Sequence, residues 1–153
     1  MKTLHSLLLA ALSATMLLPQ ASAQEVAASE GRITVRVTGA AHAEGRVGCS
    51  LWASDEGWPS ETGRATMRRW ARIREGAATC VFDDVPAGTY AVSVMHDEDG
   101  NGVLRTNLMG FPREGWGVSK NQPLRTFGAP RYRDCSFDHE SERTAVRIRL
   151  NYR

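Results

Sequence analysis

Short stretches in which apolar and polar residues alternate run through most of the sequence. At 33–37 and 146–150, isoleucine, valine or leucine takes every second position, with threonine or arginine between. A period of two is typical of a strand in an antiparallel sheet, with one face buried and the other in water. By this criterion strands are predicted at 33–37, 47–51, 79–82, 90–95, 135–137 and 146–150.

Glycine and proline separate these stretches, most clearly at 55–63 and 83–89. Several short strands divided by such turns, with at most one short helix, favour an all-β fold in which two antiparallel sheets form a sandwich. A small closed barrel is the alternative. In the sandwich, we expect each sheet to keep one face in water.

One segment, 65–74, predicts a short helix. Its apolar residues Ala65, Met67, Trp70 and Ile73 recur about every three positions. Arginines crowd the same span, which has two interpretations: a basic patch for an anionic glycan or lipid surface, or a solvated helix face. The solvated face is the more common case for such a pattern.

The segment 96–119, HDEDGNGVLRTNLMGFPREGWGVS, is the richest in residues that dictate backbone shape. Glycine adopts positive φ without penalty, and Asp or Asn side chains bond to nearby backbone. The segment follows a predicted strand, and long ordered loops at strand ends often carry function. We therefore expect one long ordered loop that holds the functional site.

Residues 1–23 have the features of a secretory signal peptide. Lys2 is followed by an apolar run at 7–18, and Ala-Ser-Ala at 21–23 precedes Gln24. The rest of the chain contains no second apolar run long enough to cross a bilayer. We therefore expect a periplasmic or secreted protein without a transmembrane segment in its mature chain.

The remaining sequence is divided into a flexible lead-in at 24–31 and a single β-sandwich domain at 32–153. About 130 residues is an ordinary size for one domain. The formal net charge of the whole chain is +2, which gives no general attraction to nucleic acid. We expect no nucleic-acid partner.

All three cysteines follow the predicted cleavage site, and disulfides persist outside the cytoplasm. Cys49 and Cys80 both lie among the inward residues of predicted strands, so we expect them to pair. Closing a loop of about 30 residues would stabilise the fold by roughly 3–4 kcal/mol. Cys135 would remain as a buried thiol.

The sequence resembles the bacterial exported family called domain of unknown function 2141 (DUF2141) across most of its mature length. The resemblance rests on linked motifs at 82–92, 96–102, 106–107, 110–119 and 127–130. It implies an immunoglobulin-like or transthyretin-like sandwich and little about activity, because the family is uncharacterised. Two departures stand out: Arg105 replaces a usual acidic residue, and Cys135 replaces a small one.

The start of the loop also resembles the opening of a calcium-binding loop. Asp97, Asp99 and Asn101 supply oxygen ligands at alternate positions, and Gly102 follows for the sharp turn. The closing bidentate carboxylate is missing, and Arg105 would oppose a cation. The alternative is that these side chains cap turns through backbone hydrogen bonds, which the pattern favours.

Two other chemistries are weaker. His96 with Asp97 and Glu114 is a possible acid/base group, although a lone histidine more often orders a loop. His42 and His139 stand in separate polar turns, so a zinc site is not favoured. Trp52, Trp58, Trp116 and Tyr132 would stack on sugars if they shared a face; the alternative, which we favour, is that Trp116 and Phe111 fold inward.

We therefore expect a non-enzymatic exported binding module that presents the 96–119 loop to a glycan, a peptide or another envelope partner. The alternatives are a metal-assisted or acid/base hydrolase that uses His96, Asp97 and Glu114, and a purely structural envelope protein. No cofactor is expected apart from possible calcium. The candidate binding residues are His96, Asp97, Asp99, Asn101, Asn107, Glu114 and Trp116.

Overall fold

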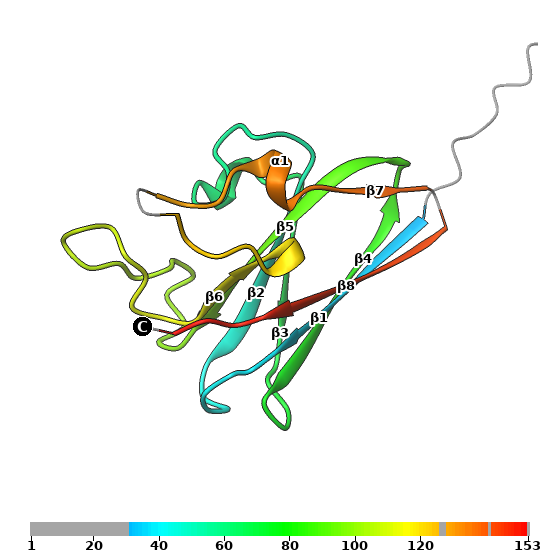
Figure 1. The fold of residues 1–153 in the computed structure, drawn as a ribbon. Coiled ribbons are helices and arrows are strands. Elements are labelled where there is room, and N and C mark those ends of the chain that lie inside the picture. The colour runs from blue at the N-terminus through cyan, green and yellow to red at the C-terminus, as the bar shows by residue number, and fades with distance from the viewer. Residues whose placement is uncertain (1–30, 126–127, 141, 153) are drawn as a thin grey trace, which may run out of the picture.

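The computed structural model describes residues 31–125, 128–140 and 142–152. These residues form two β-sheets packed face to face, which confirms the predicted all-β sandwich (Figure 1). The predicted signal peptide at 1–23, all but the last residue of the lead-in at 24–31, and Phe127 lie outside the described residues. Within the described residues, no helix is both long and apolar enough to cross a membrane.

The first sheet contains three strands in the order β4-β1-β8. They are β1 (Gly31–Thr38), β4 (Ala77–Val85) and β8 (Arg143–Arg149). The pairing of β1 with β4 is antiparallel, whereas β1 and β8 run parallel. This sheet is therefore mixed, and the expectation that it would be purely antiparallel is wrong. The chain reaches β8 beside the start of β1, where the Arg32 N–H donates to the Glu142 carbonyl at 2.8 Å.

The second sheet has the order β3-β2-β5-β6, with β7 paired to the start of β5. Its strands are β2 (Arg46–Trp52), β3 (Met67–Ala71), β5 (Gly88–Asp97), β6 (Trp116–Val118) and β7 (Phe137–His139). Short helical turns lie between the strands: η1 (Thr62–Arg64), η2 (Ser119–Asn121) and α1 (Tyr132–Cys135).

The core lies between the sheets and is built from the alternating residues. Ile33, Val35 and Phe82 of the first sheet and Leu51 and Val92 of the second are completely buried. Removing this apolar surface from water is the main stabilising term of such a fold. The alternation at 33–37, 47–51 and 90–95 therefore predicted the inward faces correctly.

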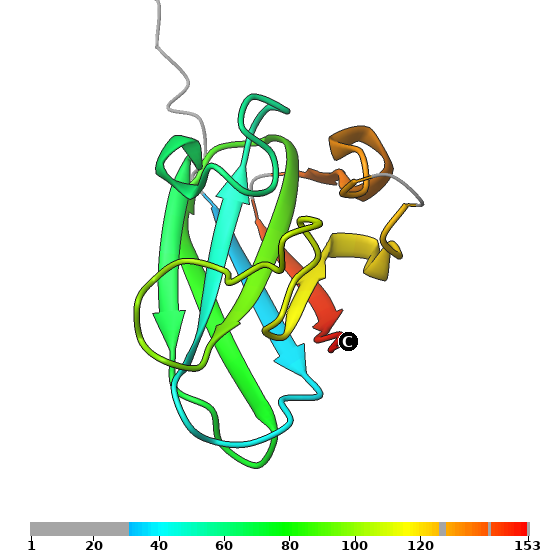
Figure 2. The same ribbon diagram turned by 90° about the vertical axis from the view of Figure 1, so that its left-hand side faces the viewer.

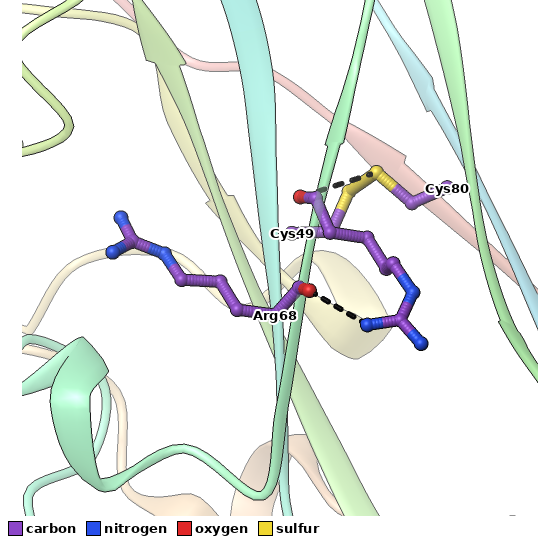
Figure 3. Close-up of a disulfide and its surroundings, with 4 residues drawn as sticks. Cys49, Arg68 and Cys80 are labelled. Atoms are coloured by element: carbon purple, nitrogen blue, oxygen red, sulfur yellow. Dashed lines mark hydrogen bonds between the residues drawn. A yellow bond between two sulfur atoms is a disulfide. The ribbon is translucent and has the colours of Figure 1, made fainter.

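The Cys49–Cys80 disulfide joins the two sheets inside this core, as predicted. It links β2 to β4, and Cys135 is a free, buried cysteine. Figure 3 shows the bridge on one side of β3, with the Arg68 side chain pointing away from it. The two faces of β3 thus have different neighbours.

The predicted helix at 65–74 is wrong, because Met67–Ala71 forms β3. Five of its residues pair in antiparallel register with β2, from Leu51 opposite Met67 to Val47 opposite Ala71. The spacing of about three came from residues that lie on both faces of the strand. The segment forms a strand because it pairs with the edge of β2. Local periodicity does not report such a pairing.

Two smaller expectations also need correction. Cys135 ends the short helix α1, so the strand expected at 135–137 begins only at Phe137. The second sheet does not keep a face in water, because most residues of β2 and β5 are buried on both faces. Figure 2 shows the reason: the long loop after β5 crosses in front of this sheet.

Candidate functional site

The long loop begins at a buried carboxylate. Asp97, the last residue of β5, is completely buried, and its Oδ2 accepts hydrogen bonds from Arg46 Nε at 2.9 Å and from the Gly102 N–H at 3.1 Å. Its Oδ1 is buried and has no hydrogen-bond partner among the described residues. One side chain therefore fixes the first turn of the loop to the neighbouring strand.

Arg46 of β2, together with Arg68 and Trp70 of β3, holds this turn. The Arg46 and Arg68 guanidinium carbons lie 3.8 and 4.7 Å from the centre of the Trp70 ring. Arg46 also donates to the Gly100 carbonyl at 3.2 Å, and Arg68 donates to the Gly102 carbonyl at 2.8 Å. Burial, and then the neighbouring Arg46 charge, lowers the pKa of Arg68. Arg68 is therefore part of the loop anchor and not of a solvated helix face.

The Trp70 ring packs against Gly48 of β2, and this contact requires a glycine. A Cβ added at Gly48 would stand 2.7 Å from the Trp70 ring, which is closer than real side chains approach. The small residue thus admits the ring, and the ring in turn stacks with both guanidinium groups.

Asp99 and Asn101 act within the loop. Asp99 Oδ1 accepts the Asn101 N–H at 3.1 Å, and Asn101 Oδ1 accepts the Val103 N–H at 2.7 Å. These are the local side chain to backbone bonds that compete with ligand binding for the same oxygens. The Asn101 side-chain oxygen is therefore already used to form a turn.

Glu114 returns from the far end of the loop and joins the aspartates. Its carboxylate is buried and accepts the N–H groups of Glu98 at 3.2 Å and Arg105 at 2.8 Å. Carboxylate oxygens of Asp97, Asp99 and Glu114 lie within 4.8 Å of one another. The possible calcium ligands were Asp97, Asp99 and Asn101; the structure groups the carboxylate of Glu114, another candidate residue, with the two aspartates.

Positive side chains border this acidic set. Arg105 Nε lies 3.5 Å from Asp99 Oδ2 and 3.4 Å from Glu114 Oε1, and Arg46 pairs with Asp97. Arginine therefore supplies the counter-charge that a calcium ion would supply in an acidic loop. The geometry favours the alternative in which these carboxylates hold backbone amides.

His96 is buried and fully engaged. Its Nε2 lies 2.7 Å from the Glu44 carbonyl, which can only accept, so this nitrogen carries the proton. Its Nδ1 lies 2.7 Å from the Tyr152 hydroxyl oxygen, within hydrogen-bond distance. Burial raises the pKa of the Tyr152 hydroxyl. Both nitrogens thus connect β5 to other parts of the chain.

His42, which no sequence pattern linked to the loop, lies beside His96. Their ring centroids are 4.8 Å apart, and His42 Nε2 is 3.7 Å from Glu98 Oε2. The expectation that His42 and His139 occupy separate polar turns is wrong for His139, which is buried in β7. No local sequence signal reports the His42 contact, because 53 residues, which form several strands, lie between the two histidines.

The loop and the second sheet together enclose an apolar groove. Two adjoining cavities of about 220 and 470 Å³ share a lining on which six residues lie: Pro59, Ser60, Leu104, Thr106, Trp116 and Val118. The smaller cavity also reaches Gly48, Ser50 and Ser93 on the sheet. These short side chains leave room where longer ones would fill the space. We refer to the two cavities as the groove.

The aromatic residues do not form a shared exposed face. Trp52 and Trp116 are buried, and Trp52 Nε1 donates to Ser93 Oγ at 2.9 Å. Trp58 packs edge-on between Trp52 and Tyr132, and its Nε1 donates to the Pro130 carbonyl at 2.8 Å. The other candidate, Asn107, holds the turn at the outer end of the loop.

The fold and site define a class of two-sheet sandwich in which a long loop, anchored by buried polar side chains, crosses one sheet. The chain belongs to a family described as an uncharacterized protein conserved in bacteria (DUF2141), whose model matches residues 35–147. This confirms the family expected from the linked motifs. No curated protein and no solved structure matches the chain.

Proposed function

We propose that the protein is an exported binding module whose groove takes an extended apolar peptide segment of an envelope protein. The observation that supports this most directly is the floor of the groove. Gly48, Ser50 and Ser93 are small residues on a sheet face that the loop covers without filling. Concave, mostly apolar sites with a few polar groups are the usual form of ligand sites.

The lining suits a peptide better than a glycan. Leu104, Trp116 and Val118 offer apolar surface, and the hydroxyl groups of Ser60 and Thr106 stand among them. Apolar side chains of a peptide would fill the groove while its amide groups bond to the hydroxyls. A sugar ring would bring many hydroxyls that this lining has few groups to satisfy.

The polar half of the loop supports a positioning role. His96, Asp97 and Glu114 are buried and bonded to backbone or to neighbouring side chains. For these residues to act as a hydrolase, substrate would have to reach groups that the fold encloses. We therefore place the binding activity in the groove, and the polar residues act by holding the loop above it.

Export is part of the proposal. It is supported by the signal-peptide pattern at 1–23 and by the disulfide between Cys49 and Cys80. Disulfides form and persist in oxidising compartments outside the cytoplasm. The N-terminus of the protein recovered from an exporting host tests this part, and a chain that still begins at Met1 would contradict it.

Two-dimensional NMR of the ¹⁵N-labelled protein tests the groove. Trp116 Nε1 is buried and has no hydrogen-bond partner among the described residues, so its signal, assigned with Trp116→Phe, reports on this region. We expect a capped pentapeptide rich in leucine and phenylalanine to shift this signal. A serine-rich pentapeptide and a neutral hexasaccharide should not.

A matched pair of variants locates the binding. Ser60 is exposed on the rim of both cavities, and Thr79 is exposed on β4 in the other sheet. Ser60→Tyr should weaken peptide binding at least fivefold, whereas Thr79→Tyr should leave it unchanged. Equal effects of the two substitutions, or shifts produced by the hexasaccharide alone, would refute the groove as a peptide site.

A further inference from the structure

The outer end of the long loop is a hydrogen-bonded hairpin, at 105–113, which we call the tip hairpin. The Arg113 N–H donates to the Arg105 carbonyl at 2.8 Å, and the Asn107 N–H donates to the Phe111 carbonyl at 2.8 Å. Asn107 Oδ1 accepts from the N–H groups of Met109 at 2.9 Å and Phe111 at 3.0 Å. These bonds fix the backbone around Leu108 and Met109.

This fixed turn exposes two large apolar side chains. Leu108 has a relative exposure of 108%, and Met109 of 78%. Exposure of neighbouring apolar side chains to water is unfavourable. Exposed apolar patches commonly mark interaction sites. The tip hairpin therefore presents a small apolar surface that projects from the fold (Figure 1).

Arginine lies directly behind the apolar tip. Arg105 and Arg113 face each other across the two arms of the hairpin, and with Asn107, Met109, Phe111 and Pro112 they line an open hollow of about 610 Å³. A guanidinium group binds phosphate oxygens in a fork geometry. The hollow thus combines cationic donors with apolar walls.

We propose that the tip hairpin docks the protein onto an anionic phospholipid bilayer. In this arrangement Leu108 and Met109 enter the interfacial part of the bilayer, and Arg113 meets the lipid phosphates at its surface. The arrangement is that of a shallow membrane anchor, in which apolar burial and attraction to anionic lipid act together. Charge complementarity favours a lipid surface, because Arg113 is exposed and has no acidic partner among the described residues, whereas the Arg105 charge is balanced by Asp99 and Glu114.

Vesicle co-sedimentation tests the proposal with protein purified after export. We expect several-fold more binding to vesicles of phosphatidylglycerol and phosphatidylethanolamine than to pure phosphatidylcholine, and a decrease with added salt. The double variant Leu108→Ser/Met109→Ser should bind at least tenfold more weakly. Arg113→Gln should lose about fivefold, as expected for one cation near an anionic surface.

Control variants separate this surface from the rest of the loop and from the groove. Val103 is also an apolar residue of the loop, 67% exposed, but lies outside the tip hairpin, so Val103→Ser should leave vesicle binding unchanged. Ser60→Tyr should also leave it unchanged. Leu108→Ser and Arg113→Gln change residues that do not line the groove, so they should keep peptide binding. Equal binding to neutral and anionic vesicles, or wild-type binding by the correctly folded double tip variant, would overturn the proposal.

Discussion

Arg46 and Asp97 are directly paired across β2 and β5, and their side chains form the ion pair that starts the long loop. Arg46 Nε lies 2.9 Å from Asp97 Oδ2, with the arginine side chain 39% exposed and the aspartate side chain completely buried. The same oxygen receives the Gly102 N–H. A single carboxylate thus connects strand pairing to the shape of the loop that covers the groove.

Asp97→Ala should destabilise the protein by about 1–3 kcal/mol, since a buried amide loses its acceptor and Arg46 loses its partner. The free energy of unfolding in urea measures the effect. Asp83, which pairs with Arg32 where both side chains are about half exposed, provides the control. Asp83→Ala should cost about 0–1 kcal/mol. If the two substitutions cost the same, Asp97 does not have this role.

The sequence predicted the strands whose own residues alternate, because one buried face imposes a period of two. The segment 65–74 failed because its conformation depends on pairing with β2, a contact between parts of the chain that are distant in sequence. The sequence did contain a signal that the outer face of the second sheet is buried, and the prediction of a wet face overlooked it. Gly48, Ser50 and Ala91 are small or apolar residues at outward positions, where a wet face would carry charge.

In the candidate site, too, local features could be predicted from the sequence, whereas contacts between distant segments could not. The turn-forming roles of Asp99 and Asn101 follow from local spacing and were among the interpretations offered by the sequence. The sequence grouped Glu114 with Asp97 in the hydrolase alternative. The observed contact of these two residues, and that of His42 with His96, depends on how the loop returns and on which strands meet. Only the tertiary structure supplies that information, because the residues carry no local marker of these contacts.

The disulfide should be a major source of stability. Cys49 and Cys80 are 31 residues apart, and the chain-entropy model gives about 3–4 kcal/mol for a loop of that length. Replacing both residues with alanine should lower the free energy of unfolding by an amount of that order. Thiol titration of the unfolded protein should find one thiol before reduction and three after it; three before reduction would disprove the bridge.

Cys135 should make stability depend on alkaline pH. Burial raises the pKa of its thiol from the ordinary value of 9.0 to about 11, with the nearby Asp134 charge as a smaller cause. Above pH 9 the unfolded chain loses this proton more readily than the folded one, so stability should fall between pH 9 and pH 11. Unfolding in urea across this range measures the slope.

The variant Cys135→Ala isolates this effect from other groups. Burial also raises the pKa values of Tyr132 and Tyr152, whose contributions remain in both proteins. The wild-type protein should therefore lose more stability than Cys135→Ala as the pH rises. Parallel pH profiles for the two proteins would show that the thiol is not held in its protonated form by burial.

Arg105 should decide whether the loop responds to calcium. Its Nε lies 3.5 Å from Asp99 Oδ2 and 3.4 Å from Glu114 Oε1, so we expect the melting temperature of the wild-type protein to be insensitive to calcium and to a chelator. Arg105→Asp removes this cation and adds a carboxylate beside two others, which is the donor chemistry that calcium prefers. The variant should be less stable without calcium and regain stability with it.

Arg105→Ala, which lacks the carboxylate, and Arg113→Asp, which places one elsewhere on the loop, should show no such recovery. A calcium-dependent rise in the melting temperature of the wild-type protein would instead show that the acidic set binds the ion despite Arg105.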